Sequence, residues 1–405
     1  MISGEISLRR RRKVGQRILR KILLGVVIAG IVSILIFTGI AWAGQTFNSD
    51  SEEGLLGLEQ FDFSEIDEFL NNKEATNTLA LESVMKYLMA GNLMGLCREI
   101  LNALTHALFS EVSTGSRLIG QILALGILGA IFTNFSSVFQ NSQISETGFF
   151  ITYLLLFTFL AMSLMESINL AANVVKDILE FMRVLMPAYF LAVAFAGGSV
   201  SAVAMYEFTL WIMTAGQWFL NTVMLPLVRV YVLLEMAGNL AKEEFLSKMT
   251  ELLEQLAAWG IKTVPGLVLG FHLIQSLILP YVDSLKQGTV QKAVSMIPGI
   301  GQGAAAMTQL LVGSGVLIKN TIGMAAVIIL MILIAMPVIK LLILLLLYQC
   351  VAAVMEPVCD KRLVSCVSAA AKGQKMMLQV VIAAALILVI TIAIVCAGTN
   401  VTYYA

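Results

Sequence analysis

Long apolar stretches separated by short polar ones occupy the chain from residue 118 to its C-terminus. A helix needs about 20 predominantly apolar residues to cross the hydrocarbon core of a bilayer. Eight stretches approach that length, at 118–135, 147–165, 188–206, 208–228, 264–281, 299–318, 321–347 and 377–398. This pattern predicts an all-α polytopic membrane domain over 118–405 with about eight transmembrane helices. The third and sixth stretches contain several glycines and give the weakest signal.

The N-terminus has the features of a targeting segment. A cluster of Lys and Arg between 9 and 21 precedes the apolar run 22–40, which is followed by Ala41-Trp42-Ala43. A basic region, an apolar region and an A-x-A end predict a secretory signal peptide over 1–43. Because the apolar run is long enough to span a bilayer, a retained signal anchor is the alternative.

An acidic segment follows the signal. Between residues 50 and 86 there are ten acidic and two basic side chains. Translocated segments carry few Lys and Arg, and apolar residues recur at helical spacing from 64 to about 111. We therefore expect 44–117 to form acidic, amphipathic, extracytoplasmic helices that pack on the membrane domain or on a partner.

The membrane domain shows weak internal similarity. Two pairs of prolines have the same spacing, and in each pair a basic residue follows the second proline at the same interval. The matched residues are Pro187, Pro226 and Arg229 in one copy and Pro298, Pro337 and Lys340 in the other. Since each copy would hold three spans, we expect an inverted repeat over about 147–262 and 264–375. A chance coincidence among the seven prolines is the alternative.

One polar stretch between spans has a clear helical stripe. Residues 243–262 place apolar side chains along one helix face and charges on the opposite face. Such a pattern is typical of a helix that lies in the membrane interface or docks on a partner. The candidate contact residues are Phe245, Leu252, Leu256 and Trp259.

Composition agrees with a membrane protein and limits its chemistry. Of 405 residues 59% are hydrophobic and 13% charged, with a formal net charge of zero, so no basic field indicates nucleic acid. The five cysteines lack metal-binding spacing, and two isolated histidines cannot form a metal cluster. No nucleophile lies near a base at a spacing found in enzyme families. We expect neither catalysis nor a cofactor.

The stretch "MIPGIGQGAAAM" at 296–307 contains G-x-G-x-x-A, the spacing of a dinucleotide-binding loop. That loop requires a preceding strand, a following helix and an acidic residue about 20 positions later. The acidic residue is missing and the chain has no βαβ pattern, so dinucleotide binding is excluded. Small residues at this spacing instead favour close helix packing or a broken helix.

Ionisable residues and helix breakers inside the spans are the candidates for a conduit, because a charge in hydrocarbon is costly unless paired or hydrated. We expect Arg229 to snorkel to the headgroups and Lys340 to have a partner or a water-filled cavity. The further candidates for the conduit or for helix breaks are Pro187, Pro226, Pro298, Pro337, Gly197, Gly198, Gly299, Gly301 and Gly303.

Two pairs of polar residues, each one helical turn apart, also lie within predicted spans. Gln217 and Asn221 are in the fourth span, and His272 and Gln275 are in the fifth. We expect hydrogen bonds between helices from both pairs, with a transport role as the alternative.

Three strings carry a resemblance to a known family. They are "VSMIPGIGQGAAAMTQLLVGSGVLIKNTIG" at 294–323, "MPVIKLLILLLLYQ" at 336–349 and "EPVCDKRLVSC" at 356–366. With the signal peptide, the acidic segment and the length, they make the chain resemble stage III sporulation protein AE of endospore-forming bacteria. The resemblance implies a multi-pass protein of the mother-cell membrane around the forespore. It assigns no functional residue.

Two functions are therefore open at the level of sequence. In the first, which the resemblance implies, the protein is a membrane subunit of the channel, or feeding tube, between mother cell and forespore. Its partners would be other products of the same operon, including a secretion-type ATPase, ring-forming proteins and small membrane subunits, together with membrane lipid. In the second, inverted repeats form a secondary transporter with a midplane site.

Overall fold

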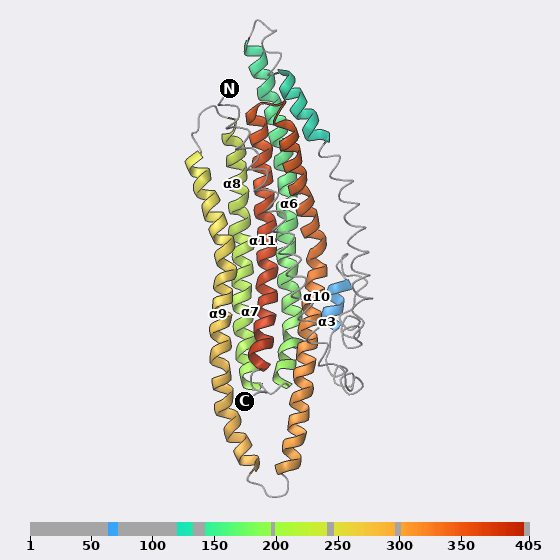
Figure 1. Cartoon of the computed structure of the whole chain (residues 1–405), viewed down its shortest axis with the longest axis vertical. Helices are drawn as coiled ribbons and strands as arrows, with labels where there is room; N and C mark the ends of the chain where they lie inside the picture. Colours follow the sequence, from blue (N-terminus) through green and yellow to red (C-terminus); the bar gives the residue numbers. More distant parts are fainter. Residues whose placement is uncertain are drawn as a thin grey trace, which may run out of the picture.

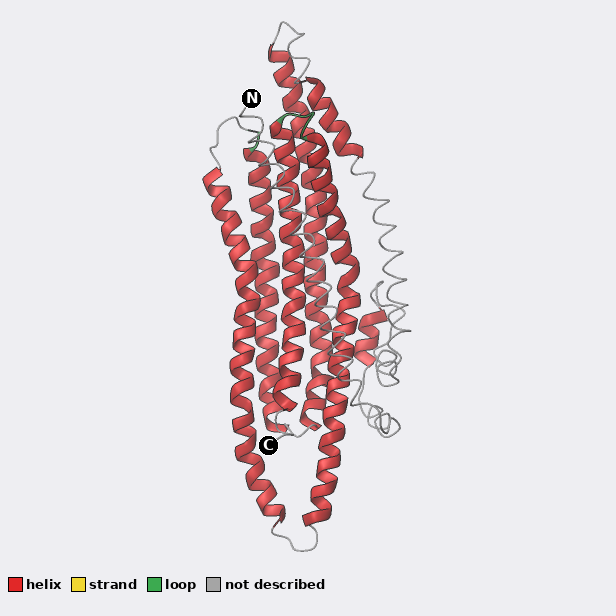
Figure 2. Ribbon diagram, viewed as in Figure 1, coloured by secondary structure: helices red, strands yellow, loops and turns green. Residues whose placement is uncertain are grey.

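The computed structural model describes residues 64–71, 120–132, 142–195, 199–240, 247–295 and 301–400. Within these ranges the chain is helical and contains no strand (Figure 2). The long helices are α6 (Ser142–Val193), α9 (Ser247–Ser295), α10 (Gly301–Met355) and α11 (Lys361–Asn400). A fifth rod is made of α7 (Ser199–Phe219), the π-helical turn η3 (Leu220–Met224) and α8 (Leu225–Gly238). An all-α polytopic fold is confirmed.

Five helices in the described part are long and apolar enough to cross a membrane, at Glu146–Val193, Glu207–Gly238, Ser247–Gln275, Gly315–Met355 and Lys361–Val395. The helix Gly120–Phe132 is apolar but shorter. The expected count of eight spans is therefore not confirmed. Several predicted spans fuse, because the amphipathic stretches between them continue the same helix instead of forming loops.

Helix α6 illustrates this fusion. It joins the predicted span 147–165 to the polar stretch 166–187, whose apolar face is buried at Ala171, Val175 and Ile178. At about 1.5 Å per residue, its 52 residues extend about 78 Å. Since the hydrocarbon of a bilayer is about 30 Å thick, much of α6 lies outside it.

The five rods run alternately up and down the bundle (Figure 1). The C-terminal end of α8 and the turn between α10 and α11 lie at the upper end of the view, whereas α6 ends and α7 begins at the lower end. In the proposed repeat, Pro226 of α8 corresponds to Pro337 of α10. The rod α7–α8 and the helix α10 run in the same direction. The expected inversion of the repeat is therefore wrong, because each copy contributes two long helices rather than three spans.

Helix α11 occupies the centre of the bundle, between α6, α8, α9 and α10 (Figure 1). Its buried positions are rich in alanine, which lets neighbouring helices approach closely. Gly373 shows how tight this packing is, since a Cβ there would overlap the Val232 side chain of α8 and come within 3.3 Å of Leu164 of α6.

Three buried tyrosines, two in α6 and one in α10, connect helices by hydrogen bonds. Tyr153 and Tyr189 of α6 donate to the carbonyl oxygens of Met236 and Ile392, at 2.5 and 3.4 Å. Tyr348 of α10 shares a hydrogen bond of 2.5 Å with Ser163 of α6. A buried phenol needs such a partner for its hydroxyl, so these bonds fix which helices meet and at what level.

The prolines of the candidate set have different local settings. Pro226 follows η3, where the Leu225 N–H donates to the Leu220 carbonyl five residues back. This wider turn accommodates a residue that has no N–H and crowds the preceding turn. Pro187 and Pro337 lie inside the unbroken helices α6 and α10.

The predicted N-terminal signal, 1–43, lies outside the described residues. Of the acidic segment 44–117, the structure describes only α3 (Ser64–Asn71). Phe69 of α3 packs on Phe181 of α6, with ring centroids 5.9 Å apart. This part of the acidic segment therefore packs on the membrane domain rather than standing apart from it.

Candidate polar sites within the bundle

Four helices share a zone without charged residues. The uncharged runs are 208–228 of α7–α8, 263–282 of α9, 320–339 of α10 and 376–400 of α11. Contacts place three of them side by side, since a Cβ on Gly216 would touch Val264 and Val268 of α9 and Ile387 of α11, and α10 packs on α11. Each run has about the 20 residues that cross hydrocarbon. We call these four runs the apolar zone.

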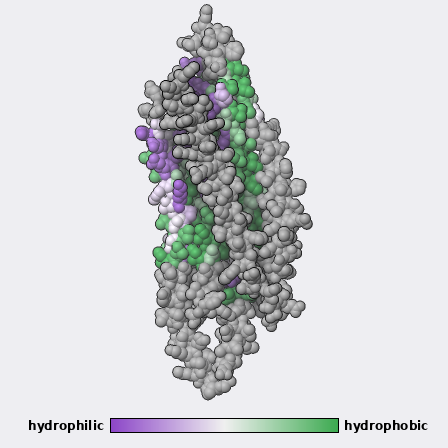
Figure 3. All heavy atoms as spheres, in the orientation of Figure 1, coloured by the Kyte–Doolittle hydropathy of each residue, from purple (hydrophilic) through white to green (hydrophobic). Residues whose placement is uncertain are grey.

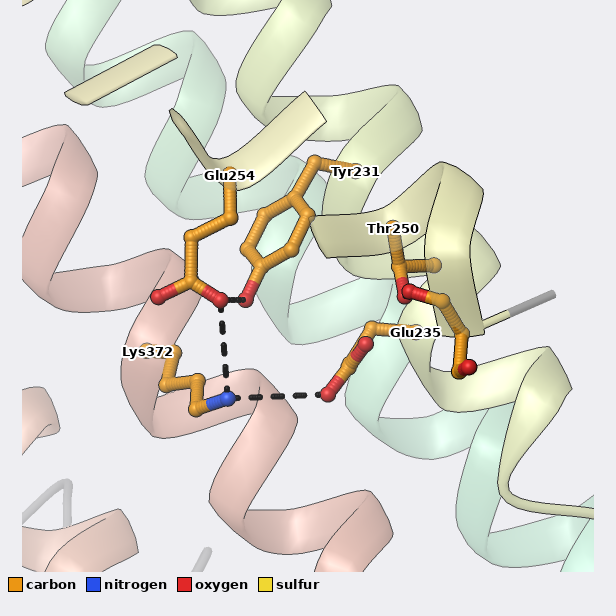
Figure 4. Close-up of polar contacts among 6 residues, drawn as sticks. Tyr231, Glu235, Thr250, Glu254 and Lys372 are labelled. Atoms are coloured by element: carbon orange, nitrogen blue, oxygen red, sulfur yellow. Dashed lines mark hydrogen bonds and ion pairs between the residues drawn. The ribbon is translucent and has the colours of Figure 1, made fainter. Parts of the chain in front are cut away.

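A charged cluster joins three helices (Figure 4). Its charged residues lie just beyond the upper ends of these uncharged runs. Lys372 Nζ of α11 is 3.5 Å from Glu235 Oε1 of α8 and 3.7 Å from Glu254 Oε2 of α9. Tyr231 of α8 donates a hydrogen bond of 2.9 Å to the same Glu254 oxygen. We call Tyr231, Glu235, Glu254 and Lys372 the Lys372 cluster.

The Lys372 cluster holds α9 against the rest of the bundle. The side chains of Glu235, Glu254 and Lys372 are 25, 43 and 50% exposed, so water reaches all three. Exposed ion pairs of this kind contribute about 0.5–1 kcal/mol each. The arrangement is suited to setting the position of a helix, since one ammonium group is shared by carboxylates from two different helices.

The residues of the Lys372 cluster carry no distinctive signal in the sequence. Glu254 and Lys372 belong to two polar stretches that lie far apart in the chain, and Glu235 follows a predicted span. The only available signal was charge on the polar face of each stretch. Such charge predicts a solvated face as readily as a contact, so the partner could not be chosen without the packing of α8, α9 and α11.

Lys340 has an ion-pair partner on another helix. Its Nζ of α10 lies 3.8 Å from Glu166 Oε1 of α6, with side-chain exposures of 35 and 76%. Arg229 of α8 is exposed and makes no ion pair within the described part of the chain. The two basic residues that the proline match pairs thus have different surroundings. A conduit role for either stays a prediction.

The structure does not bring the other conduit candidates into one site. Pro187 and Pro226 are exposed on α6 and α8, and Pro337 is half-buried on α10. Gly301 and Gly303 begin α10. Pro298, Gly197, Gly198 and Gly299 lie outside the described residues.

Buried amide and imidazole groups lie in the apolar zone. Gln217 Nε2 of α7 donates to the Ala384 carbonyl of α11 at 2.9 Å, a bond between helices as the sequence predicted. His272 Nδ1 instead meets Gln275 Oε1 of its own helix at 3.3 Å. Gln217 Oε1 and His272 Nε2 are buried without a hydrogen-bond partner among the residues described.

The apolar stripe on the upper part of α9 faces outward. Leu252, Leu256 and Trp259 are 57, 46 and 67% exposed, and Met249 on the same face is 54% exposed. Phe245 lies outside the described residues. Figure 3 shows hydrophilic atoms gathered on one side of the upper bundle and hydrophobic atoms on the other.

The turn between α10 and α11 contains a half-buried thiol. Cys359 Sγ donates to the Gly126 carbonyl at 3.3 Å. Burial raises the pKa of the Cys359 thiol above its ordinary value, which disfavours the thiolate. The described residues contain no group of three or more His, Cys, Asp or Glu that could hold a metal ion.

The sequence of this bundle matches a known protein family. The family model described as stage III sporulation protein AE matches residues 79–399, which is most of the chain. The chain belongs to the stage III sporulation protein AE family. It is 24% identical over 277 residues to stage III sporulation protein AE of Bacillus subtilis (strain 168), covering 68% of this chain and 69% of that protein. No solved structure matches it.

Membership of the stage III sporulation protein AE family assigns the chain to sporulation. With five helices able to span a membrane in the part of the chain that the structure describes, it is a multi-pass membrane protein. The matched residues include those of α6 to α10 and nearly all of α11. They therefore include both partners of the Lys340–Glu166 and Lys372–Glu235 ion pairs.

Proposed function

We propose that this protein is a membrane subunit of the channel complex that links mother cell and forespore during endospore formation. The observation that carries the proposal is the family match over 79–399 together with the multi-pass bundle. The protein would lie in the mother-cell membrane around the forespore. Its partners would be the other stage III sporulation A operon products, among them the ATPase, the ring-forming proteins and the small membrane subunits.

The surface of the bundle supports a role in an assembly. The stripe of Met249, Leu252, Leu256 and Trp259 begins above the apolar zone, whose α9 run starts at 263. Large exposed apolar side chains outside hydrocarbon are typical of protein contact sites. Trp259 and Lys262, next to the zone, suit the headgroup level. We therefore assign the stripe above Trp259 to a partner subunit.

We further propose that residues 1–43 direct export and that 44–117 lies on the extracytoplasmic side. The ten acidic and two basic side chains of 50–86 support this side, because translocated segments carry few Lys and Arg. The transporter alternative depended on an inverted repeat. Since α7–α8 and α10 run in the same direction, that alternative has lost its support.

The experiment is complementation with stripe variants. Leu252→Ser with Leu256→Ser should lower the heat-resistant spore count at least tenfold while membrane levels of the protein stay unchanged. Leu267→Ser is the matched control, because Leu267 is 68% exposed on the same helix but lies inside the apolar zone. Normal sporulation by the double variant would remove the stripe as a partner site.

A further inference from the structure

The exposed side chains along one ridge of α6 change from apolar to polar and back to apolar. The outward positions in its upper part are apolar at Ile151, Leu155 and Met162, with Thr158 as the one polar residue between them. The next outward positions, spaced by three or four residues, are all polar and all exposed: Glu166, Asn169, Asn173, Lys176, Glu180 and Arg183. Below them the ridge is apolar again at Leu191. We call the six polar residues the α6 polar ridge.

The α6 polar ridge lies beside the apolar zone of the neighbouring helices. Above it, Leu164 of α6 is near the position of Gly373 in α11, and below it Tyr189 donates to the Ile392 carbonyl. The ridge therefore runs alongside the part of α11 between 373 and 392, most of which belongs to the uncharged run 376–400. From 166 to 183 it rises about 25 Å, close to the thickness of hydrocarbon.

Rotation of α6 cannot hide these side chains from lipid. The opposite face of the helix is buried in the core at Ile168, Ala171, Val175, Ile178 and Met182. Side chains three and four residues apart share one face of a helix, so the polar and apolar faces are fixed relative to each other. Charged side chains inside a membrane face a water-filled space or the interior of an assembly.

We propose that the α6 polar ridge is the water-lined wall of a passage across the membrane. It carries two acidic residues, two basic residues and two amides, in the order Glu166, Asn169, Asn173, Lys176, Glu180 and Arg183. Because neither sign predominates, the wall suits small hydrophilic solutes, neutral or zwitterionic, rather than ions of one charge. The passage rests on the proposed channel function, whereas the hydration of the ridge can be measured independently.

The test is cysteine accessibility in membranes of sporulating cells. In a full-length chain without its native cysteines, Asn169→Cys and Asn173→Cys should react with a membrane-impermeant thiosulfonate at least tenfold faster than Leu191→Cys and Leu267→Cys. Leu191 lies below the ridge on α6 and Leu267 lies in the apolar zone on α9. All four positions are exposed and lie at the level of the apolar zone, so the substitutions leave the core intact. Equal rates at all four positions would overturn the proposal, because lipid or protein would then cover the ridge.

A second measurement concerns passage itself. Asn173→Trp adds bulk to the wall and should lower spore yield at least tenfold, whereas Leu191→Trp, which adds bulk at an exposed apolar position of the same helix outside the polar ridge, should leave it unchanged. If the ridge reacts with the reagent but Asn173→Trp sporulates normally, the passage is refuted. If the ridge reacts but the protein does not associate with other operon products, the proposed channel function is refuted, whereas the hydration of the ridge is confirmed.

Discussion

Replacement of Lys372 by methionine tests the Lys372 cluster, because methionine keeps much of the length of the side chain and removes its charge. Two contacts are lost, at 3.5 Å to Glu235 and 3.7 Å to Glu254. All three side chains are partly exposed, so each contact is assigned about 0.5–1 kcal/mol. The two carboxylates are left without their cation, which adds a repulsion of about 0.5 kcal/mol. The total is about 2 kcal/mol.

This loss should be visible as a lower melting temperature of the purified protein in detergent. A destabilisation of about 2 kcal/mol corresponds to about 2 °C for a chain of this size. The difference between wild type and Lys372→Met should shrink in about 1 M salt, since salt screens partly exposed charges. The matched control is Lys375→Met, because Lys375 is exposed on the same helix and forms no ion pair within the described part of the chain.

The shared contact also predicts non-additivity. Glu254→Gln and Lys372→Met remove the same ion pair, so the double variant should lose less stability than the sum of the two single variants. If Lys372→Met and Lys375→Met lower the melting temperature equally, the charge of Lys372 has no specific effect, and the cluster does not hold α9 in place.

Three further predictions follow from the packing. Gly373→Val should destabilise the bundle by about 1–3 kcal/mol through overpacking, whereas Gly266→Ala, where a Cβ meets nothing within 4 Å, should not lower the melting temperature. In a variant with Cys359 as its only thiol, the alkylation rate should keep rising with pH beyond the ordinary thiol pKa, because burial raises the pKa of Cys359. In denaturant the pH profile of the rate should return to the ordinary range. Identical pH profiles for the folded and the denatured protein would refute the burial. Reporter tags inserted after Leu240 and at Val358 should be accessible from the same side of the membrane, and opposite sides would restore the inverted repeat.

The helical class, the membrane location and the family could be predicted from the sequence, because long apolar runs leave few alternatives and the family strings are distinctive. The number of spans could not. Residues 166–187 are polar enough to be a loop, yet their apolar face packs on the core and extends α6 without a break. A helix longer than the bilayer cannot be recognised from hydropathy alone.

The sites were harder to predict than the fold. Lys340 was recognisable as a charge among apolar residues, but its partner Glu166 is distant in the sequence and belongs to an amphipathic stretch between two predicted spans. The Lys372 cluster joins three helices and had no local motif. The proline spacing suggested a repeat, but spacing alone does not say whether the two copies run in the same or in opposite directions. Their relative direction follows only from how the helices connect at each end of the bundle.

Our central proposal is that this chain works as one subunit of a sporulation membrane complex. Its most direct test is affinity purification of the tagged full-length protein from crosslinked sporulating cells, followed by native sizing and mass spectrometry of what is recovered. We predict a large assembly that contains the other stage III sporulation A operon products in reproducible ratios. A chain that migrates at its own size, without those products, and that takes up solute alone when reconstituted in liposomes would contradict the proposal.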